Sequence, residues 1–430
     1  MVFRLLYNLL APPVAILAAP FWLLKTHKRG GLSARLLEKL ARYDADSPDE
    51  TGQGRRPIYL HAVSVGEGNI ARKLITSWAT KYPEERFLLA MGTSTGFDLV
   101  NQSPPPRTEV MYAPLDFPLF INELFARYRP ALIVLIEHEV WPNMMHSASK
   151  QAIPVAIANT RLSRRSAKRL NKFKPLLGDM YRQINWAGAQ TQDDKPRISA
   201  IGIRDESIKV IGSVKFDPAL ETPAASAFDP SEFLSALGTG PLLMALSTHP
   251  GEELVFAKAA AQVANARIVI IPRHMERRES IQQELNEAGF NTILRSDGEA
   301  LNLSKSATNI LVVDSTGEMP VFTKKALVVF IGKTLTAHGG QNPCEAIAAG
   351  VPVIAGPHLG NFEPLASELR GNEGLWTVNN EEELSKALQE LSQSPVKRTN
   401  QCQNALQALE GHRGATARTI EALALIKERT

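Results

Sequence analysis

The chain has 430 residues, enough for two domains that each bury a core of their own. Its hydrophobic content of 44% and charged content of 21% are those of an ordinary soluble globular protein. The formal charge of +4 is small for this length, so composition does not favour a nucleic-acid partner, although local basic patches could face a membrane. Cys344 and Cys402 lie far apart and form no CxxC pair, which argues for a reducing compartment and against a structural zinc site.

The N-terminus differs in composition from the rest. Residues Val2–Leu24 are almost uncharged and end near an aromatic pair, and a basic cluster follows at 25–29. The length suits a membrane span or a shallow anchor, while three prolines weaken a straight helical span. A removed signal peptide is disfavoured because no small-residue cleavage motif is clear. The basic cluster predicts that this end stays on the cytoplasmic side of a membrane, which the segment either spans or lies on.

The next segment, Leu32–Tyr43, has leucines at helical spacing among basic residues. One interpretation is an amphipathic helix on an anionic membrane surface. The other is a helix packed on the main domain. Both stay open at this point.

The stretch Pro57–Asn69 begins as an apolar run that predicts a buried parallel strand, and a helical pattern follows from about Ile70. Gly66 and Glu67 are therefore expected on a tight strand-to-helix turn. In an open α/β sheet such turns lie at the carboxyl ends of the strands, where ligands bind. Glu67 is either a functional carboxylate or a first-turn residue that interacts with the helix dipole.

Apolar strands then alternate with helical patterns, which predicts parallel sheets covered on both faces. A Pro-, Ala-, Ser- and Thr-rich stretch, Pro218–Pro230, interrupts the alternation and is expected to link two domains. The predicted organisation is an anchor segment at 1–43, a first Rossmann-like domain at 44–222 and a second at 223–430, facing each other across a cleft. The helical segment Ala415–Glu428 is expected to return to the first domain. The predicted strands are Pro57–Val65, Arg86–Met91, Val110–Tyr112, Ala131–Ile136, Val155–Ala158, Trp186–Ala189, Lys209–Ile211, Leu242–Leu246, Ala266–Ile271, Thr292–Leu294, Ile310–Val313, Ala326–Ile331 and Val351–Ala355.

Polar and glycine-rich loops follow successive strands of the second half, and loops at one edge of a sheet converge on one crevice. Gly339 and Gly340 precede a short helix, with Asn342 expected as its N-cap and Pro343 as its first residue. Such a junction can hold a phosphate, to which Arg273 or Lys333 could add positive charge. Taken singly, each of these residues also has an ordinary structural explanation.

Together these motifs resemble the 3-deoxy-D-manno-octulosonic acid (Kdo) transferases of lipopolysaccharide synthesis, which are glycosyltransferases of the GT-B fold. The similarity runs from the apolar N-terminus to about Phe362. The matching stretches are His61–Glu67, Glu137–Asn143, Asn159–Ser166, Gly212–Asp217, Ser247–Glu253, Pro272–His274, Gly317–Met319, His338–Glu345 and Gly356–His358.

The resemblance implies an inverting transfer of Kdo from CMP-Kdo to a lipid A precursor such as lipid IVA, with release of CMP. It places the catalytic base on Glu67 and a second functional carboxylate on Glu137 or Glu139, with Glu137 preferred. Lys215 is a further candidate contact. The implied nucleotide contacts are Ser247, Arg273, His274, Gly317, Glu318, Met319, Gly340, Asn342 and Glu345. No metal or other cofactor is expected, because the first domain has no Asp-x-Asp dyad at a strand end.

The sequence departs from the family pattern at three places. The family usually has Gly-Gly-Ser where this chain has Ile331–Thr334, and it commonly has His and Leu where this chain has Gln341 and Cys344. Other interpretations stay open: another GT-B transferase, a nucleotide-sugar epimerase, or an inactive glycosyltransferase-like membrane protein. A Rossmann dehydrogenase is disfavoured because no GxGxxG follows the first strand.

Overall fold

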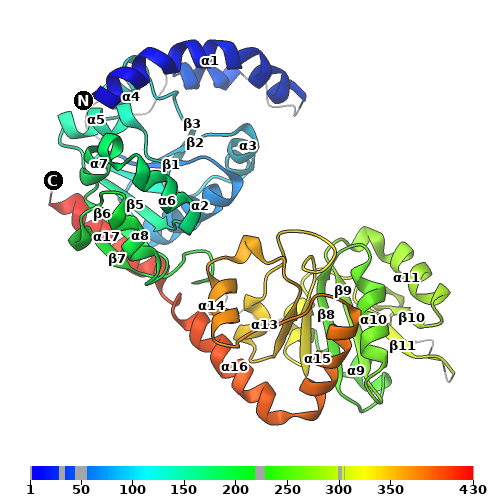
Figure 1. Cartoon of the computed structure of the whole chain (residues 1–430). Helices are drawn as coiled ribbons and strands as arrows, with labels where there is room; N and C mark the ends of the chain where they lie inside the picture. Colours follow the sequence, from blue (N-terminus) through cyan, green and yellow to red (C-terminus); the bar gives the residue numbers. More distant parts are fainter. Residues whose placement is uncertain are drawn as a thin grey trace. The chain divides into compact units, whose positions relative to one another are not determined.

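The structure, a computed structural model, describes residues 2–28, 34–43, 56–217, 228–298, 303–304 and 306–429. The chain forms two compact units: unit 1 comprises Met1–Asp217 with Gly414–Thr430, and unit 2 comprises Pro218–Arg413. Figure 1 follows the chain from unit 1 into unit 2 and back to unit 1 at its red C-terminal end. Most of the expected linker, at 218–227, lies outside the described residues.

Unit 1 contains, in its described part, a seven-stranded parallel sheet with the spatial order β3-β2-β1-β4-β5-β6-β7. Its strands are β1 Ile58–Ala62, β2 Phe87–Met91, β3 Thr108–Tyr112, β4 Leu132–Ile136, β5 Val155–Thr160, β6 Trp186–Ala189 and β7 Ile208–Val210. Its main helices are α2 Val65–Lys81, α3 Ser94–Gln102, α4 Pro118–Tyr128, α5 Pro142–Lys150, α6 Arg164–Lys172, α7 Lys174–Arg182, α8 Asp194–Ala200 and α17 Ala415–Glu428.

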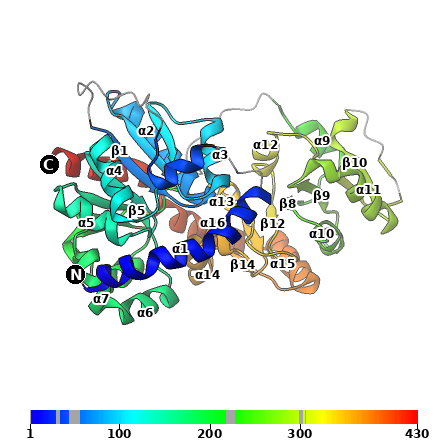
Figure 2. The ribbon, with the colours of Figure 1, turned by 90° about the horizontal axis from the view of Figure 1, so that it is seen from above.

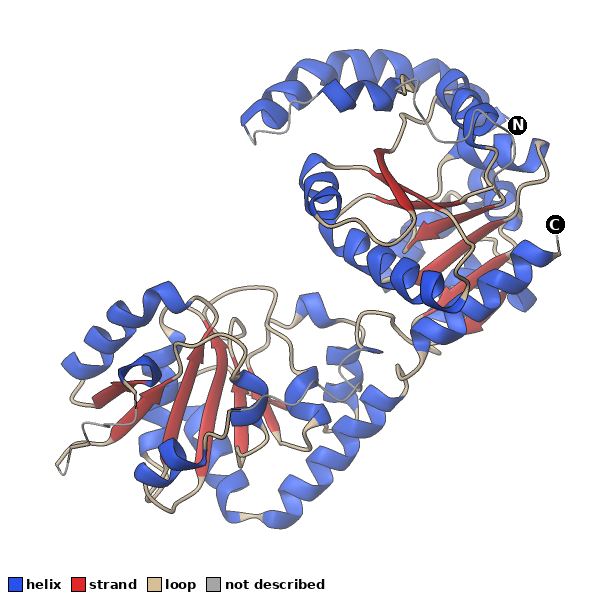
Figure 3. Ribbon diagram, turned by 180° about the vertical axis from the view of Figure 1, so that it is seen from behind, coloured by secondary structure: helices blue, strands red, loops and turns tan. Residues whose placement is uncertain are grey.

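Helices cover both faces of this sheet, as Figure 3 shows. Alternate strand residues therefore enter two separate cores: Ile58 and Leu60 belong to one, and Tyr59 belongs to the other. A strand buried on both faces reads as a continuous apolar run rather than an alternating one. That is why every strand expected from the sequence is present.

Unit 2 repeats the design with a parallel sheet of the order β10-β11-β9-β8-β12-β13-β14 among the described residues. Its strands are β8 Leu242–Thr248, β9 Arg267–Pro272, β10 Asn291–Leu294, β11 Asn309–Val312, β12 Val328–Ile331, β13 Val353–Ala355 and β14 Trp376–Thr377. Its helices are α9 Ser231–Ala236, α10 Glu252–Ala261, α11 Arg278–Glu287, α12 Met319–Thr323, α13 Cys344–Ala348, α14 Leu365–Gly371, α15 Glu381–Gln393 and α16 Pro395–Glu410. The sequence did not predict the two-residue β14.

The strand order reverses once in each sheet. In unit 1, β1 lies between β2 and β4, and in unit 2, β8 lies between β9 and β12. At such a switch point the loops leaving the two central strands diverge, which opens a crevice outside the carboxyl ends. The loops after β1 and β4, and those after β8 and β12, are therefore the places where a ligand is expected.

The C-terminal helix α17 packs against α2 of unit 1. Asp217 holds the start of α17 on unit 1, because its carboxylate accepts hydrogen bonds from Gly414 N at 2.6 Å and Thr416 N at 2.9 Å. Burial acts to raise the pKa of Asp217. The hydrogen bonds from Thr416 and Gly414 and the charge of Lys73 outweigh this effect and lower the pKa below its usual value.

A 3-10 helix, η1 (Ala34–Leu40), covers the edge strand β3. Tyr112 N donates to Glu38 Oε2 at 2.7 Å, and Arg35 Nη2 donates to Val110 O at 2.5 Å, so edge groups of β3 are paired. Leu37 and Leu40 remain exposed. The described part of Leu32–Tyr43 therefore packs on the main domain, and Leu36 contacts its core. Contact of Leu37 and Leu40 with a membrane surface stays a prediction.

The first helix, α1 (Val2–Lys28), is continuous although it contains Pro12, Pro13 and Pro20. It contacts α5 and α7 of unit 1 (Figure 2), and Asn143 Nδ2 donates to Asn8 Oδ1 at 2.7 Å. By length and composition alone, Phe3–Phe21 could cross a membrane. Its large exposed apolar side chains are Leu5, Leu6, Leu9, Leu10, Val14, Ile16, Leu17, Phe21 and Leu24.

Candidate active site

Glu67 lies in the first turn of α2, directly after β1. The helix begins at Val65, five residues earlier than the pattern from Ile70 indicated, so Gly66 and Glu67 are helical rather than part of a separate turn. Ser64 is the N-cap, and its Oγ accepts a hydrogen bond from Glu67 N at 3.2 Å.

The Glu67 carboxylate completes this cap from the other side. Its Oε2 accepts from Val63 N at 2.7 Å and its Oε1 accepts from Ser64 Oγ at 2.8 Å. Glu67 therefore caps its own helix, as the first-turn interpretation of this residue predicted. The reason is local, because the Ser-x-x-Glu spacing brings the carboxylate back over unpaired N–H groups at the helix start. Orientation by two donors still leaves the carboxylate other lone pairs for a further partner.

Glu137 and Glu139 follow β4, on the other side of the switch point from Glu67. Glu137 has a φ of +64°, a left-handed conformation that is unusual for a residue other than glycine, and its N–H donates to Ala158 O at 2.9 Å. Burial raises the pKa of Glu137, and the charge of Glu67 raises it further, while Arg161 and Lys215 act in the opposite direction. Burial raises the pKa of Glu139 too, with contributions from Glu67 and Glu137. The three carboxylates thus form one electrostatic group.

The loop that carries Lys215 is held beside this group by a buried amide. Asn159, in the left-handed region at φ +57°, accepts on its Oδ1 from Val214 N at 3.0 Å and from Ser213 Oγ at 3.2 Å. Positive charge from Lys215 and Arg161 reaches Glu137, as its pKa shows. The structure therefore brings together four residues that the sequence singled out from three separate loops: Glu67, Glu137, Glu139 and Lys215.

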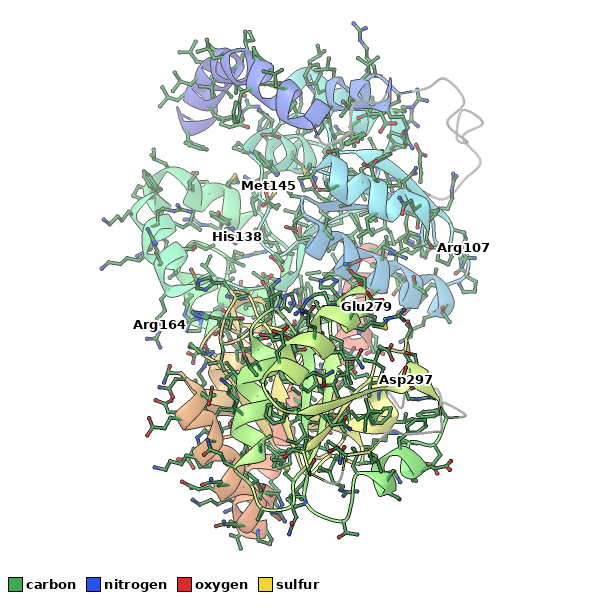
Figure 4. The ribbon with its side chains drawn as sticks, turned by 90° about the vertical axis from the view of Figure 1, so that its right-hand side faces the viewer. Arg107, His138, Met145, Arg164, Glu279 and Asp297 are labelled. Carbon is green, nitrogen blue, oxygen red and sulfur yellow. The ribbon has the colours of Figure 1, made fainter. Side chains whose placement is uncertain are left out.

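His138 lies between the two carboxylates in sequence, and Figure 4 labels it in unit 1. Burial lowers its pKa to about 4, so the imidazole is neutral at pH 7. Its Nε2 is buried without a hydrogen-bond partner among the described residues.

In unit 2, the predicted residues also gather at one edge of the sheet. Ser247 lies one residue before the end of β8 with a φ of +53°, and its Oγ lies 3.9 Å from the sulfur of Met319, the first residue of α12. Arg273 follows the neighbouring strand β9, where its N–H donates to Thr248 O at 3.1 Å and its side chain is exposed. His274 is exposed too, and its ring lies 5.7 Å from that of His249 between centroids.

Glu318 is already engaged within unit 2. Its carboxylate pairs with the Arg295 guanidinium at 3.1 and 3.2 Å and accepts from Ser315 Oγ at 2.5 Å. The preceding Gly317 has a φ of +84°, and a Cβ added there would have no neighbour within 4 Å, so its backbone is open to a ligand.

The segment after β12 carries the remaining candidates. Gly340 has a φ of +75°, and a Cβ there would meet His358 O at 2.9 Å, so glycine is required. Asn342 Oδ1 accepts from Cys344 N at 3.0 Å, but α13 begins at Cys344 with Pro343 as its N-cap, one residue later than expected. Burial raises the pKa of Glu345, whose Oε2 is buried with no hydrogen-bond partner among the described residues. An unpaired buried carboxylate oxygen is suited to a donor group on a ligand.

Sequence reasoning assigned no role to two adjacent buried glutamates. Glu252 and Glu253, at the start of α10, are both completely buried. Glu252 accepts backbone hydrogen bonds from two loops, whereas Glu253 accepts from Thr248 Oγ1 at 2.9 Å and from Arg277 Nη1 at 2.8 Å. The signal was present as two carboxylates directly after a loop glycine in Ser247–Glu253, but first-turn glutamates are common and usually exposed.

Comparison with known proteins gives the same result over both units. Residues 34–218 match the model of the family described as 3-Deoxy-D-manno-octulosonic-acid transferase (kdotransferase). The 3-deoxy-D-manno-octulosonic acid transferase of Haemophilus influenzae is 31% identical over 92% of this chain and 92% of its own length. That of Bordetella pertussis is 32% identical over 85% of this chain and 86% of its own.

The chain belongs to the Kdo transferase family. It is therefore a glycosyltransferase, and the dehydrogenase and epimerase interpretations are set aside. Among solved structures, the UDP-GlcNAc 2-epimerase of Neisseria meningitidis has the same fold, with a TM-score of 0.54 and 13% identity over 86% of this chain and 99% of that one. A putative UDP-N-acetylglucosamine 2-epimerase of Listeria monocytogenes has a TM-score of 0.52 and 16% identity over 87% and 98%. The predicted GT-B class of two Rossmann-like units is thus confirmed.

The β12 loop of this Kdo transferase depends on backbone conformation at the site of the Lys333-Thr334 departure. Gly332 is indispensable, because a Cβ there would lie 2.4 Å from Ser247 O. Lys333 has a φ of +58°, which a glycine would adopt with less strain. No group of three or more His, Cys, Asp or Glu side chains in the described residues is placed to hold a metal ion.

The raised pKa of Glu137 predicts how this Kdo transferase responds to pH. Burial disfavours the ionised carboxylate in the folded state, so the charge costs folding free energy at pH 7 and costs nothing well below the unfolded pKa of about 4.3. Glu137→Gln should raise the melting temperature at pH 7, and the gain should vanish near pH 3. The exposed Glu206→Gln is the control, with no change expected at either pH. A melting temperature lowered by Glu137→Gln at pH 7 would contradict this electrostatic assignment.

Proposed function

We propose that this enzyme transfers Kdo from CMP-Kdo to a lipid A precursor of the lipid IVA type and releases CMP. Unit 1 binds the acceptor and supplies the base, and unit 2 binds the cytidine nucleotide. The observation that carries the proposal is the carboxylate group at the switch point of unit 1, in a chain related to Kdo transferases along most of its length.

In the proposed reaction, Glu67 accepts the proton of an acceptor sugar hydroxyl as that oxygen attacks the anomeric carbon of Kdo. The hydrogen bonds from Val63 N and Ser64 Oγ fix the carboxylate, so that little reorganisation is needed when the proton arrives. Burial raises the pKa values of Glu137 and Glu139, and the nearby charge of Glu67 adds to this effect. Lys215 and Arg161 act on the pKa of Glu137 in the opposite direction and are proposed to attract an anionic acceptor.

The bond from the anomeric carbon to the CMP phosphate oxygen breaks in the same displacement, and the configuration inverts. Arg273 is proposed to stabilise the phosphate charge, and Glu345 to accept from a ribose hydroxyl through its unpaired buried oxygen. Ser247, His274, Gly317, Met319, Gly340 and Asn342 are proposed as further contacts. Glu318 is proposed to support the nucleotide loop rather than to bind the ligand through its carboxylate, because that carboxylate already binds Arg295 and Ser315.

The proposed location is the cytoplasmic face of the inner membrane. The apolar side chains along α1 are exposed in the protein, and lipid would cover them. This segment is the proposed anchor, whereas the buried Lys39 of η1 donates to Gly92 O at 2.7 Å and is not available to lipid.

The test of the activity is incubation with CMP-Kdo and the lipid A precursor, with added sugars counted by mass. In this assay Glu67→Gln should lose about two to four orders of magnitude in turnover if Glu67 is the base. It should also lose about 1 kcal/mol of stability, since the amide replaces only one of two acceptor oxygens. Ser64→Ala is the matched control, because it removes the cap and keeps the carboxylate. Ser64→Ala should lower the stability about as much as Glu67→Gln does, but it should reduce turnover far less. Equal turnover losses in the two variants would assign Glu67 to capping alone.

Arg273→Ala should weaken CMP binding by about 1.5–3 kcal/mol, the usual contribution of a hydrogen bond to a charged group. Isothermal calorimetry with CMP measures the change, and Arg278→Ala on the exposed side of α11 is the control. Unchanged CMP affinity in Arg273→Ala would remove this residue from the nucleotide site.

Deleting residues up to Leu24 should release the enzyme from membranes and leave its affinity for CMP intact, because unit 2 carries the nucleotide contacts. Sedimentation with membranes at high salt, followed by calorimetry on the released protein, measures both. A truncated enzyme that still sediments completely would place the anchor elsewhere.

A further inference from the structure

The Glu252 carboxylate joins the two loops that flank the switch point of unit 2. Its Oε2 accepts from His249 N at 3.0 Å, in the loop after β8, and from Lys333 N at 2.6 Å, in the loop after β12. Its Oε1 accepts from Thr334 N at 2.9 Å and Leu335 N at 3.1 Å. Four backbone N–H groups thus converge on one carboxylate whose side chain is completely buried.

Such an arrangement is stable only when all its parts are present. A buried carboxylate needs several donors to replace its hydration, and buried N–H groups in irregular loops need acceptors. The loops after β8 and β12 leave two neighbouring strands, and both contain N–H groups that need acceptors. Glu252, projecting from the first turn of α10, supplies acceptors to both.

The β12 loop that Glu252 holds also positions the segment that follows it, which carries the proposed nucleotide contacts Gly340, Asn342 and Glu345. Gly340 N donates to Lys333 O at 3.0 Å, and Gln341 N donates to Gly332 O at 3.1 Å. The glycine turn therefore rests on the loop that Glu252 holds, and Asn342 and Glu345 follow directly. Gln341 Nε2 also lies 3.0 Å from His249 Nε2, which ties the segment back to the β8 loop.

We infer that Glu252 is a positioning residue for the donor nucleotide. It does not touch the ligand. It fixes the distance between the β8 and β12 loops and so sets where Gly340, Asn342 and Glu345 present their groups. Lys333 and Thr334 are compatible with this role, because the carboxylate binds their main-chain N–H groups and is indifferent to their side chains. The inference rests on the proposed function insofar as it takes unit 2 to hold CMP.

Glu252→Gln tests the role, since the amide keeps one acceptor oxygen and turns an NH₂ donor toward N–H groups. CMP affinity and the KM for CMP-Kdo should each worsen about 10- to 100-fold, the range typical of groups that orient first contacts. The KM for the lipid acceptor, bound by unit 1, should stay within about twofold. If the role of Glu252 is merely structural, Glu252→Gln should lower the melting temperature but should not raise the KM for CMP-Kdo selectively over the KM for the lipid acceptor.

Glu279→Gln is the matched control, because Glu279 also lies in the first turn of a unit 2 helix and is exposed (Figure 4). It should leave both KM values unchanged. A folded Glu252→Gln enzyme with wild-type CMP affinity would overturn the inference.

A second measurement needs neither a variant nor a ligand. In the wild-type protein, amide hydrogen exchange at Lys333, Thr334 and Leu335 should be slower than at the exposed Thr336 by at least about tenfold. Equal exchange rates would show that Glu252 does not hold the β12 loop, even if Glu252→Gln fails to fold. If the wild-type enzyme does not bind CMP, the nucleotide assignment fails, while the exchange result still decides whether Glu252 holds the loop.

Discussion

Both units depend on one constraint, the satisfaction of backbone N–H groups where the chain leaves a buried parallel strand. Inside a sheet the ladder pairs these groups, but at the carboxyl ends the chain turns irregular while it is still shielded from water. Carboxylates repeatedly supply the acceptors: Glu67 binds Val63 N, Asp116 binds Asn143 N and Met144 N, and Glu252 binds four N–H groups. A charged acceptor makes stronger hydrogen bonds than a carbonyl, which suits positions where geometry must be held.

The same edges hold the candidate chemistry, and the two units use them differently. At the switch point of unit 1, burial raises the pKa values of Glu137 and Glu139, and the charge of Glu67 raises them further. At the switch point of unit 2, the buried carboxylate is saturated by main-chain donors, while the Arg273 side chain and the backbone of Gly317 are exposed. A proton acceptor fits the first environment and an anionic nucleotide fits the second.

Capping and the proposed catalysis are compatible uses of the Glu67 side chain. The Ser64–Glu67 pair fixes the carboxylate at the start of α2, and its charge acts on the carboxylates of the loop after β4. A carboxylate held by two donors keeps its orientation before a substrate binds. In the proposed mechanism, the cap would therefore preorganise the base.

The sequence by itself determined the strands, the division into two α/β units and the family, because continuous apolar runs and ordered loop motifs are local signals. It also located the candidate residues to the carboxyl ends of the strands. It misplaced the start of α2 and of α13, since helix ends depend on which side chain captures the free N–H groups. Only the tertiary structure decided that η1 turns Glu38 and Lys39 inward to cover β3 and leaves Leu37 and Leu40 exposed, because the edge strand required partners. It alone decided that Glu252 spans two loops separated by about eighty residues, because such a pairing follows from strand order, which no local pattern encodes.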